Sequence, residues 1–102
     1  IGGAVYRVPV LLDGFISAAA ALCAVRMVPQ TADFLFASHV SREPAARMIL
    51  DALALKPLIT AEMALGEGTG AVAAIPLFDM ALAVYSEMRT FEEIDVEAYK
   101  PL

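Results

Sequence analysis

The clearest structural pattern in the sequence lies in residues 7–27, RVPVLLDGFISAAAALCAVRM. Its first part, 7–12, is a short apolar run ending at Asp13-Gly14, which predicts a buried strand, parallel to its neighbour, followed by a turn. Pro9 lacks a ladder N–H, so we expect it either to stand early in the strand or to mark an edge strand. Its second part, 15–27, predicts an alanine-rich helix that packs closely on its neighbours, and Pro29 ends that helix.

The next segment repeats the order of strand and helix. Residues 34–37 form a second apolar run with two aromatic residues, and they predict another strand. Ser41 is expected to cap a following helix, with Glu43 and Pro44 in its first turn. The apolar residues of that helix are spaced as one stripe, which predicts its buried face. The stripe consists of Ala45, Met48, Ile49, Ala52 and Leu53.

The last third of the chain is less regular. Residues 55–59 fit neither a helix nor a strand clearly, and a short helical turn that starts at Thr60 or Glu62 is expected to end at Gly66. Residues 71–88 predict a long apolar helix with a kink at Pro76. The acidic tail begins with Thr90-Phe-Glu-Glu, in which Glu93 stands at the third helical position of a capping box.

These elements predict an α/β fold, the last part of a doubly wound sheet flanked by helices. Two strands do not make a stable sheet alone. Hydrophobic residues make up 60% of the 102 residues, against about 45–50% in ordinary domains. A chain of this size cannot bury that much apolar surface by itself. Because the sequence also starts abruptly at Ile1, beside a predicted strand, we expect it to be a piece of a longer polypeptide.

Composition argues against several classes of function. The net charge of −5 and the lack of a basic stripe disfavour nucleic-acid binding. The longest apolar run, 15–25, is too short for a membrane span, and Pro76 and Asp79 interrupt the second, so no membrane segment is expected. Cys23 is the only cysteine, which predicts a buried apolar residue, no disulfide and a cytoplasmic protein. No metal-ligand spacing occurs, so no metal site is expected.

Polar residues follow both predicted strands and are candidates for binding. In parallel sheets, ligands bind beyond the carboxyl ends of the strands, where Asp13-Gly14 and Ser38–Ser41 should share one rim. The helix that Ser41 is expected to cap would offer backbone N–H groups to a phosphate. The alternative is that Ser41 is only a cap and Asp13-Gly14 only a turn. His39, the only histidine, is interpreted as a hydrogen-bonded structural residue.

Gly66-Glu67-Gly68-Thr69-Gly70 is the most unusual stretch of the sequence. Its glycines allow backbone conformations closed to other residues and let a ligand approach the main chain. It is not a dinucleotide-binding motif, because no clear strand precedes it and no ribose-binding acid follows at the usual distance. A carboxylate held in such a loop beside apolar surface can act as a general base near neutral pH. The alternative is that Glu67 is a solvated loop residue.

Taken in order, three motifs resemble the nicotinate-nucleotide–dimethylbenzimidazole phosphoribosyltransferase family. They are 7–17, 37–44 and 65–71, followed by the long apolar helix and 88–93. The resemblance spans nearly the whole chain but only about the last third of a family member. It implies that residues 1–102 are the C-terminal portion of a phosphoribosyltransferase α/β domain with a Rossmann-like, mostly parallel sheet.

The resemblance also implies a reaction, that of a pentosyltransferase of cobalamin biosynthesis. A nitrogen of 5,6-dimethylbenzimidazole attacks nicotinate mononucleotide, nicotinate leaves, and α-ribazole 5′-phosphate forms. The family works as a homodimer and needs no metal or other cofactor. Glu67 matches the family's catalytic base. The substrate-binding residues that the resemblance implies are Asp13, Gly14 and Ser41 around the ribose and phosphate, and Leu65, Gly66 and Gly68 around the base.

Two hypotheses follow for this chain. The first is that it carries the catalytic base of this transferase, with half of the pocket missing, so that the 102 residues alone are inactive. The second is a non-catalytic nucleotide-binding or dimerisation module that keeps the fold. An intact Glu67 favours the first hypothesis.

Overall fold

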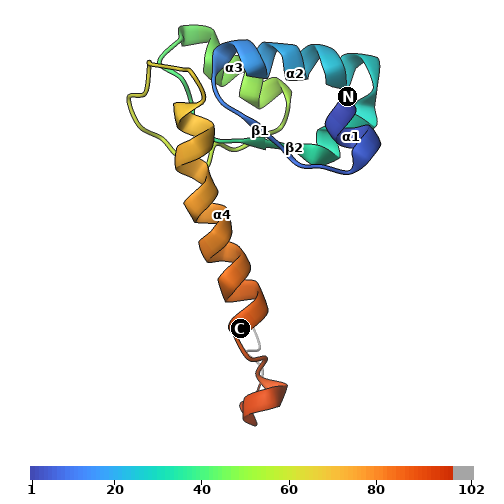
Figure 1. Cartoon of the computed structure of the whole chain (residues 1–102), viewed down its shortest axis with the longest axis vertical. Coiled ribbons are helices and arrows are strands. Elements are labelled where there is room, and N and C mark those ends of the chain that lie inside the picture. Colours follow the sequence, from blue (N-terminus) through green and yellow to red (C-terminus); the bar gives the residue numbers. More distant parts are fainter. Residues whose placement is uncertain (98–102) are drawn as a thin grey trace.

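Two short parallel strands form the centre of the computed structural model, which describes residues 1–97 (Figure 1). Strand β1 (Val10–Leu12) pairs in parallel with β2 (Leu35–Ala37), so that Leu11 lies opposite Phe36. Helix α2 (Phe15–Met27) and the 3₁₀ helix η1 (Pro29–Phe34) connect them. The predicted parallel pair and the bounds of the alanine-rich helix are confirmed. Residues 98–102, the end of the predicted domain, lie outside the described residues.

The first strand is shorter than predicted, because a helix precedes it. Helix α1 (Gly2–Tyr6) was not expected, and it ends where Arg7 adopts a left-handed conformation with φ of 55°. The Val8 N–H then donates to the Gly3 carbonyl at 2.8 Å, which closes the helix end. Residues 7–9 are therefore a connection, and strand pairing starts only at Val10, after the proline.

A third extended segment continues the sheet beyond β2. His39 and Ile59 form a parallel bridge, and the Ile59 N–H donates to the Ser38 carbonyl at 2.9 Å. The helical turn expected over residues 60–66 is wrong, since this segment has no helical residue. It runs instead as an irregular connection, in which the Met63 N–H donates to the Ala61 carbonyl at 2.8 Å and the Arg42 N–H donates to the Met63 carbonyl at 3.4 Å.

The hydrophobic core lies between the sheet and two helices, α2 and α3 (Pro44–Ala52), that cover the same face. Ala18 and Ala21 of α2 are buried against this face, as the closely packed helix predicts. Cys23 of the same helix points away from the core and is exposed, so its predicted burial is wrong. The opposite face of the sheet carries Phe36, whose side chain is 38% exposed. Sheets of parallel strands are normally covered on both faces. The described residues cover this second face only in part.

Helix α3 matches the predicted stripe only in part, because Ile49 packs against the core and Leu53 is buried while Met48 and Ala52 are exposed. Its buried residues are Ala46 and Leu50, followed just after the helix by Leu53, whereas Met48 is 71% exposed. The helix also starts later than predicted: its N-cap is Glu43 and its first residue is Pro44, so the prediction of Ser41 as N-cap is wrong. Proline fixes a helical φ without needing a partner for an N–H, which favours this start.

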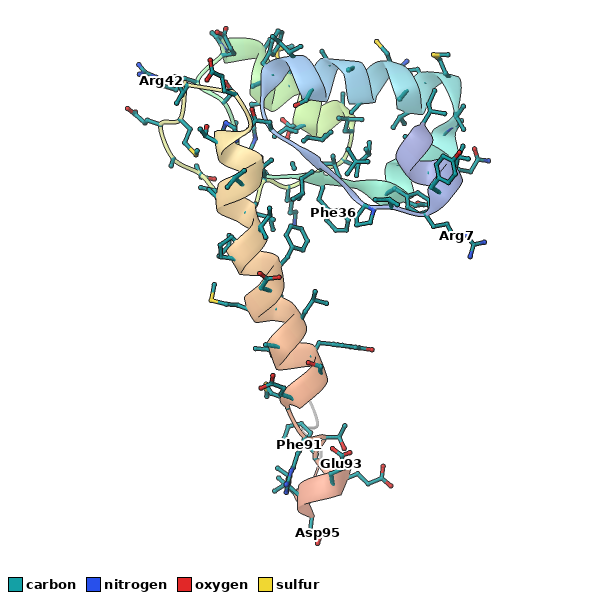
Figure 2. The ribbon with its side chains drawn as sticks, viewed as in Figure 1. Arg7, Phe36, Arg42, Phe91, Glu93 and Asp95 are labelled. Atoms are coloured by element: carbon teal, nitrogen blue, oxygen red, sulfur yellow. The ribbon has the colours of Figure 1, made fainter. Side chains whose placement is uncertain are left out.

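Helix α4 (Thr69–Glu87) extends away from the rest of the molecule (Figure 1). Only Gly70 and Ala74, near its start, are buried, and Pro76 lies inside it. The predicted long helix is confirmed, while the kink at Pro76 stays a prediction. Figure 2 shows Phe36 on the side of the sheet toward this helix, where its ring meets Phe78 edge to face at 5.2 Å between ring centroids.

Two further features of the C-terminal part bear on the sequence predictions. By length and composition alone, α4 is apolar enough to cross a membrane, a test that core helices of soluble proteins also pass.

Beyond α4, the Thr90 N–H donates to the Glu93 carboxylate at 2.7 Å, and the Glu93 N–H donates to the Thr90 hydroxyl at 3.3 Å. This is the predicted capping box, and it lies at the start of the 3₁₀ helix η2 (Glu92–Ile94).

Candidate functional site

The predicted site residues all line one cavity at the carboxyl ends of β1 and β2. Its volume is about 550 Å³, and it lies between the start of α2 and the loop that leads into α4. Residues from three separate motifs meet there, although up to 55 positions separate them in the chain. The predicted residues that line the cavity are Asp13, Gly14, Ser41, Leu65, Gly66, Glu67 and Gly68.

Asp13 holds the loop that carries Glu67. One of its carboxylate oxygens accepts the Gly68 N–H at 3.0 Å, and the other accepts the N–H groups of Gly70 at 2.9 Å and Ala71 at 3.2 Å. Burial alone would raise the pKa of Asp13, but these backbone hydrogen bonds and the attraction of His39 together lower it below its ordinary value. Asp13 therefore caps the N-terminus of α4 as a carboxylate.

Glu67 occupies a backbone conformation that is uncommon for a residue with a side chain. Its φ is 54°, between Gly66 at 75° and Gly68 at 82°, so three successive residues have a left-handed backbone. The Glu67 side chain is exposed and borders the cavity. Non-glycine residues in this region are enriched at functional sites, where the surrounding structure enforces the conformation.

His39 forms part of the wall behind this loop. It is 5% exposed, and its Nδ1 lies 3.2 Å from the Ser38 hydroxyl. A Cβ built on Gly70 would overlap the same nitrogen, so the ring packs directly against the Gly70 backbone. The ring also lies next to Gly14, at 3.8 Å from the Cβ position. The interpretation of His39 as a buried, hydrogen-bonded residue agrees with these contacts.

Three helices begin at the cavity, and they differ in what their first turns offer. The N-terminus of α4 is occupied by Asp13, and α3 starts at Pro44, which has no N–H, with Glu43 as its N-cap. At the start of α2, the Ser17 hydroxyl accepts the Gly14 N–H at 3.0 Å and donates to the Gly14 carbonyl at 2.9 Å. The first amides of α2 have no partner within the helix, so this end is the most suitable for an anion.

Ser41 lies at the cavity in a role different from the predicted cap. Its hydroxyl accepts the Glu43 N–H at 3.4 Å, a long hydrogen bond. The hydroxyl therefore keeps most of its capacity for a ligand. Arg42, the neighbouring cation, is exposed and points outward from the body in Figure 2.

Two further residues shape the site: Ser38, which the sequence placed in the polar group after the second strand without a role of its own, and Met63, which sequence reasoning missed. Ser38 is fully buried, and its hydroxyl donates to the carbonyls of Leu12 and Asp13, which ties the ends of both strands together. Met63 lines the cavity from the irregular segment that was predicted as a helical turn. The polar residues at the end of an apolar strand placed Ser38 at the rim, but its burial and its contacts with the end of β1 could not be predicted from that pattern. The position of Met63 depends on tertiary packing.

The charged residues of the cavity are acidic. Asp13, Glu43 and Glu67 line it, and among the described residues no lysine or arginine does. Within residues 1–97, no three histidine, cysteine, aspartate or glutamate side chains come together to hold a metal ion. The described lining thus supplies carboxylates, hydroxyls, backbone groups and apolar surface.

Known proteins resemble this chain along nearly its whole length. The family model described as a phosphoribosyltransferase matches residues 1–96. The nicotinate-nucleotide–dimethylbenzimidazole phosphoribosyltransferases of Acetivibrio thermocellus and Clostridium acetobutylicum are 50% and 49% identical to it, over 99% and 100% of the chain. The crystal structure of CobT from Thermus thermophilus superposes with a TM-score of 0.86 at 47% identity over 95% of the chain. The chain spans 29% of the length of each of these three proteins.

Proposed function

Because the chain belongs to this phosphoribosyltransferase family, we propose that it contributes the catalytic base to a transfer of the phosphoribosyl group from nicotinate mononucleotide to 5,6-dimethylbenzimidazole. The products are α-ribazole 5′-phosphate and nicotinate. The observation that carries this proposal is the convergence of all seven predicted residues on one cavity. Residues 1–102 are, on this proposal, the C-terminal portion of a Rossmann-like α/β domain that acts in the cytoplasm.

The proposed chemistry needs one carboxylate. The benzimidazole nitrogen forms a bond to C1′ while the bond from C1′ to the cationic nicotinate nitrogen breaks, so the leaving group takes the electron pair and needs no acid. The benzimidazole must lose its N–H proton, which Glu67 accepts. General-base catalysis of this kind contributes about 10²–10⁴-fold to a rate. The exposed Glu67 borders the cavity, which is where a base must lie to reach this proton.

The two ends of the cavity suit the two substrates. Leu65 borders it and is 73% exposed, so a flat aromatic base would cover its apolar surface. Gly66 and Gly68 leave open space beside the loop, since a Cβ at either position would meet no atom within 4 Å. We place the benzimidazole at this end.

The ribose and phosphate belong at the opposite side, near the start of α2. The unpaired amides there and the Ser41 hydroxyl can donate to a phosphate, and Gly14 lets the main chain approach closely. Asp13 lies between the two substrates in this arrangement, since it precedes Gly14 and its carboxylate accepts the Gly68 N–H. No cation lines the described cavity, so the phosphate charge would be met by residues outside this chain, in agreement with a pocket that is only half present.

The test is Glu67→Gln in a polypeptide of the relatives' full length. The amide keeps the shape of the side chain but cannot take a proton, so kcat should fall about 10²–10⁴-fold while nicotinate mononucleotide still binds. Calorimetric titration and a product assay measure the two quantities. Glu62→Gln, at an exposed glutamate that does not line the cavity, is the matched control. Near-normal turnover of Glu67→Gln would remove Glu67 from this role.

The second candidate function is a dimerisation module that keeps the fold without the activity. The exposed apolar side chains of α4, such as Leu82 at 62% and Tyr85 at 89%, favour a surface that another chain covers. We propose that the complete enzyme is a homodimer. Comparing the unchanged polypeptide with the Glu67→Gln variant separates the two candidates. A non-catalytic module would show no turnover even before the substitution.

A further inference from the structure

We propose that Asp13 is a positioning residue whose carboxylate fixes the backbone of the 66–70 loop and so determines where the Glu67 carboxylate lies. This inference rests on the proposed function, since it concerns the placement of the proposed base. Asp13 borders the cavity, but three of the about four acceptor positions of its carboxylate already face backbone N–H groups of the loop. Its main contribution to the site therefore runs through the loop.

The loop needs such an anchor, because little else holds it. Glu67 has a left-handed backbone, which a residue with a Cβ adopts only under constraint. Its side chain and that of Leu65 are exposed, so packing does not supply the constraint. On one side of Glu67, the Thr69 hydroxyl donates to the Gly66 carbonyl at 2.7 Å. On the other side, the Gly68 N–H is held by Asp13 at 3.0 Å.

Asp13 is itself attached to a rigid frame. It follows β1 directly, and the buried Ser38 hydroxyl at the end of β2 donates to its carbonyl at 3.2 Å. The His39 ring packs against Gly70, one of the residues whose N–H Asp13 accepts. The loop is thus joined to both strand ends, and a base built on rigid elements keeps its geometry better than one on a free loop.

The chemistry of the contact calls for a carboxylate. Both Asp13 oxygens face N–H donors, which only a side chain with two acceptor oxygens satisfies. An asparagine would turn an NH₂ group toward one of these donors. The contact also lies at the N-terminus of α4, where the helix dipole favours a negative charge.

The experiment compares Asp13→Asn with the unchanged full-length enzyme in two measurements. The first is steady-state kinetics with both substrates, and the second is amide hydrogen exchange of residues 66–72. Displacement of the base should lower kcat by about 10²-fold, with the KM for nicotinate mononucleotide nearly unchanged. The amides of Gly68, Gly70 and Ala71 should exchange faster. Asp33→Asn, at an exposed aspartate of η1 outside the cavity, is the matched control and should leave both unchanged.

Two outcomes would overturn the proposal. One is a raised KM with kcat unchanged, which would make Asp13 a substrate contact only. The other is a loss of kcat with no change in exchange of the loop amides. If Asp13→Asn does not fold, Ser38→Ala replaces it, because Ser38 supports Asp13 without lining the cavity. Ser38→Ala should then show both changes, a lower kcat and faster exchange of the loop amides, each smaller than in Asp13→Asn. A fall in kcat without faster loop exchange overturns the proposal.

The failure of this inference can be told apart from the failure of the proposed function. If Glu67→Gln keeps near-normal turnover, Glu67 is not the base, and the proposed function fails at that point. The exchange measurement on Asp13→Asn still reports whether Asp13 anchors the loop. If Glu67→Gln is inactive and Asp13→Asn is fully active, the base is correctly assigned and only the positioning role is wrong.

Discussion

At the scale of single residues, glycine serves two different purposes in the 66–70 loop. Gly66 and Gly68 have positive φ values of 75° and 82° with open space around them, so they are needed for backbone conformation. Gly70 lies inside α4 without a positive φ, and it is needed for space, because the His39 ring occupies the position of a Cβ. The sequence shows three glycines of equal appearance, but their physical requirements differ.

Gly70→Ala is predicted to destabilise the fold. The new methyl group would overlap the His39 ring, which is buried and contacts the Ser38 hydroxyl, so the ring cannot move aside freely. Overpacking of this kind costs about 1–3 kcal/mol. Urea denaturation measures the change in the free energy of unfolding. Gly2→Ala, where a Cβ meets nothing within 4 Å, is the control and should show no loss.

A double substitution tests the stated cause. Removing the ring with His39→Ala should relieve the overlap, so Gly70→Ala should cost less in that background than in the unchanged protein. Equal costs in both backgrounds would contradict the assignment of the His39 ring as the obstacle.

At the scale of elements, the buried face of α3 agrees only in part with the one that its apolar pattern predicts. Ile49 and Leu53 of the predicted stripe do pack in the core, but Met48 is exposed, and the helix also buries Ala46 and Leu50. Alanine is small enough to lie on either face, so the pattern did not fix the rotation of the helix. The packing of Leu50 with Ala18 of α2 and Ala37 of β2 decided it.

Leu50→Ala and Met48→Ala therefore form a matched pair that distinguishes the two orientations. Leu50 is 3% exposed, and truncating it should cost about 2–5 kcal/mol in the free energy of unfolding. Met48 is 71% exposed, and its truncation should change stability by less than about 0.5 kcal/mol. Chemical denaturation of both variants measures these values. A larger loss for Met48→Ala would restore the predicted stripe and contradict the observed packing.

At the scale of the whole molecule, apolar surface remains uncovered in two places. One is the face of the sheet that carries Phe36, a residue that is 38% exposed although its ring packs on Phe78 of α4. The other is α4 itself, which is largely exposed beyond its first turns (Figure 1). Large exposed apolar patches commonly mark interaction surfaces, and we propose that another protein segment covers both.

The 102-residue chain alone is predicted to form no product from nicotinate mononucleotide and 5,6-dimethylbenzimidazole. The described cavity has no cation for the phosphate, and its remaining walls would come from the rest of a longer protein. Product formation by the isolated chain and by a full-length polypeptide, at equal concentration, measures the difference. Robust turnover by the isolated chain would contradict the proposal that it holds only part of the pocket.

Features that depend on neighbouring residues could be predicted from the amino-acid sequence. The bounds of α2, the position of β2, the long α4 and the Thr90–Glu93 capping box follow from local patterns of apolar, proline and capping residues. The ordered motifs also placed Glu67 and Asp13 among the candidate site residues. These signals are local because helix and strand preferences act over a few residues.

The contacts between distant parts of the chain could be identified only from the folded structure. Asp13 contacts amides that lie 55 to 58 positions away, and the space at Gly70 depends on a histidine from another strand end. No spacing in the sequence encodes such contacts, since they arise where the core brings two strand ends and a helix start together. Glu67 was recognised from its motif, but the carboxylate that holds its loop became visible only in the fold.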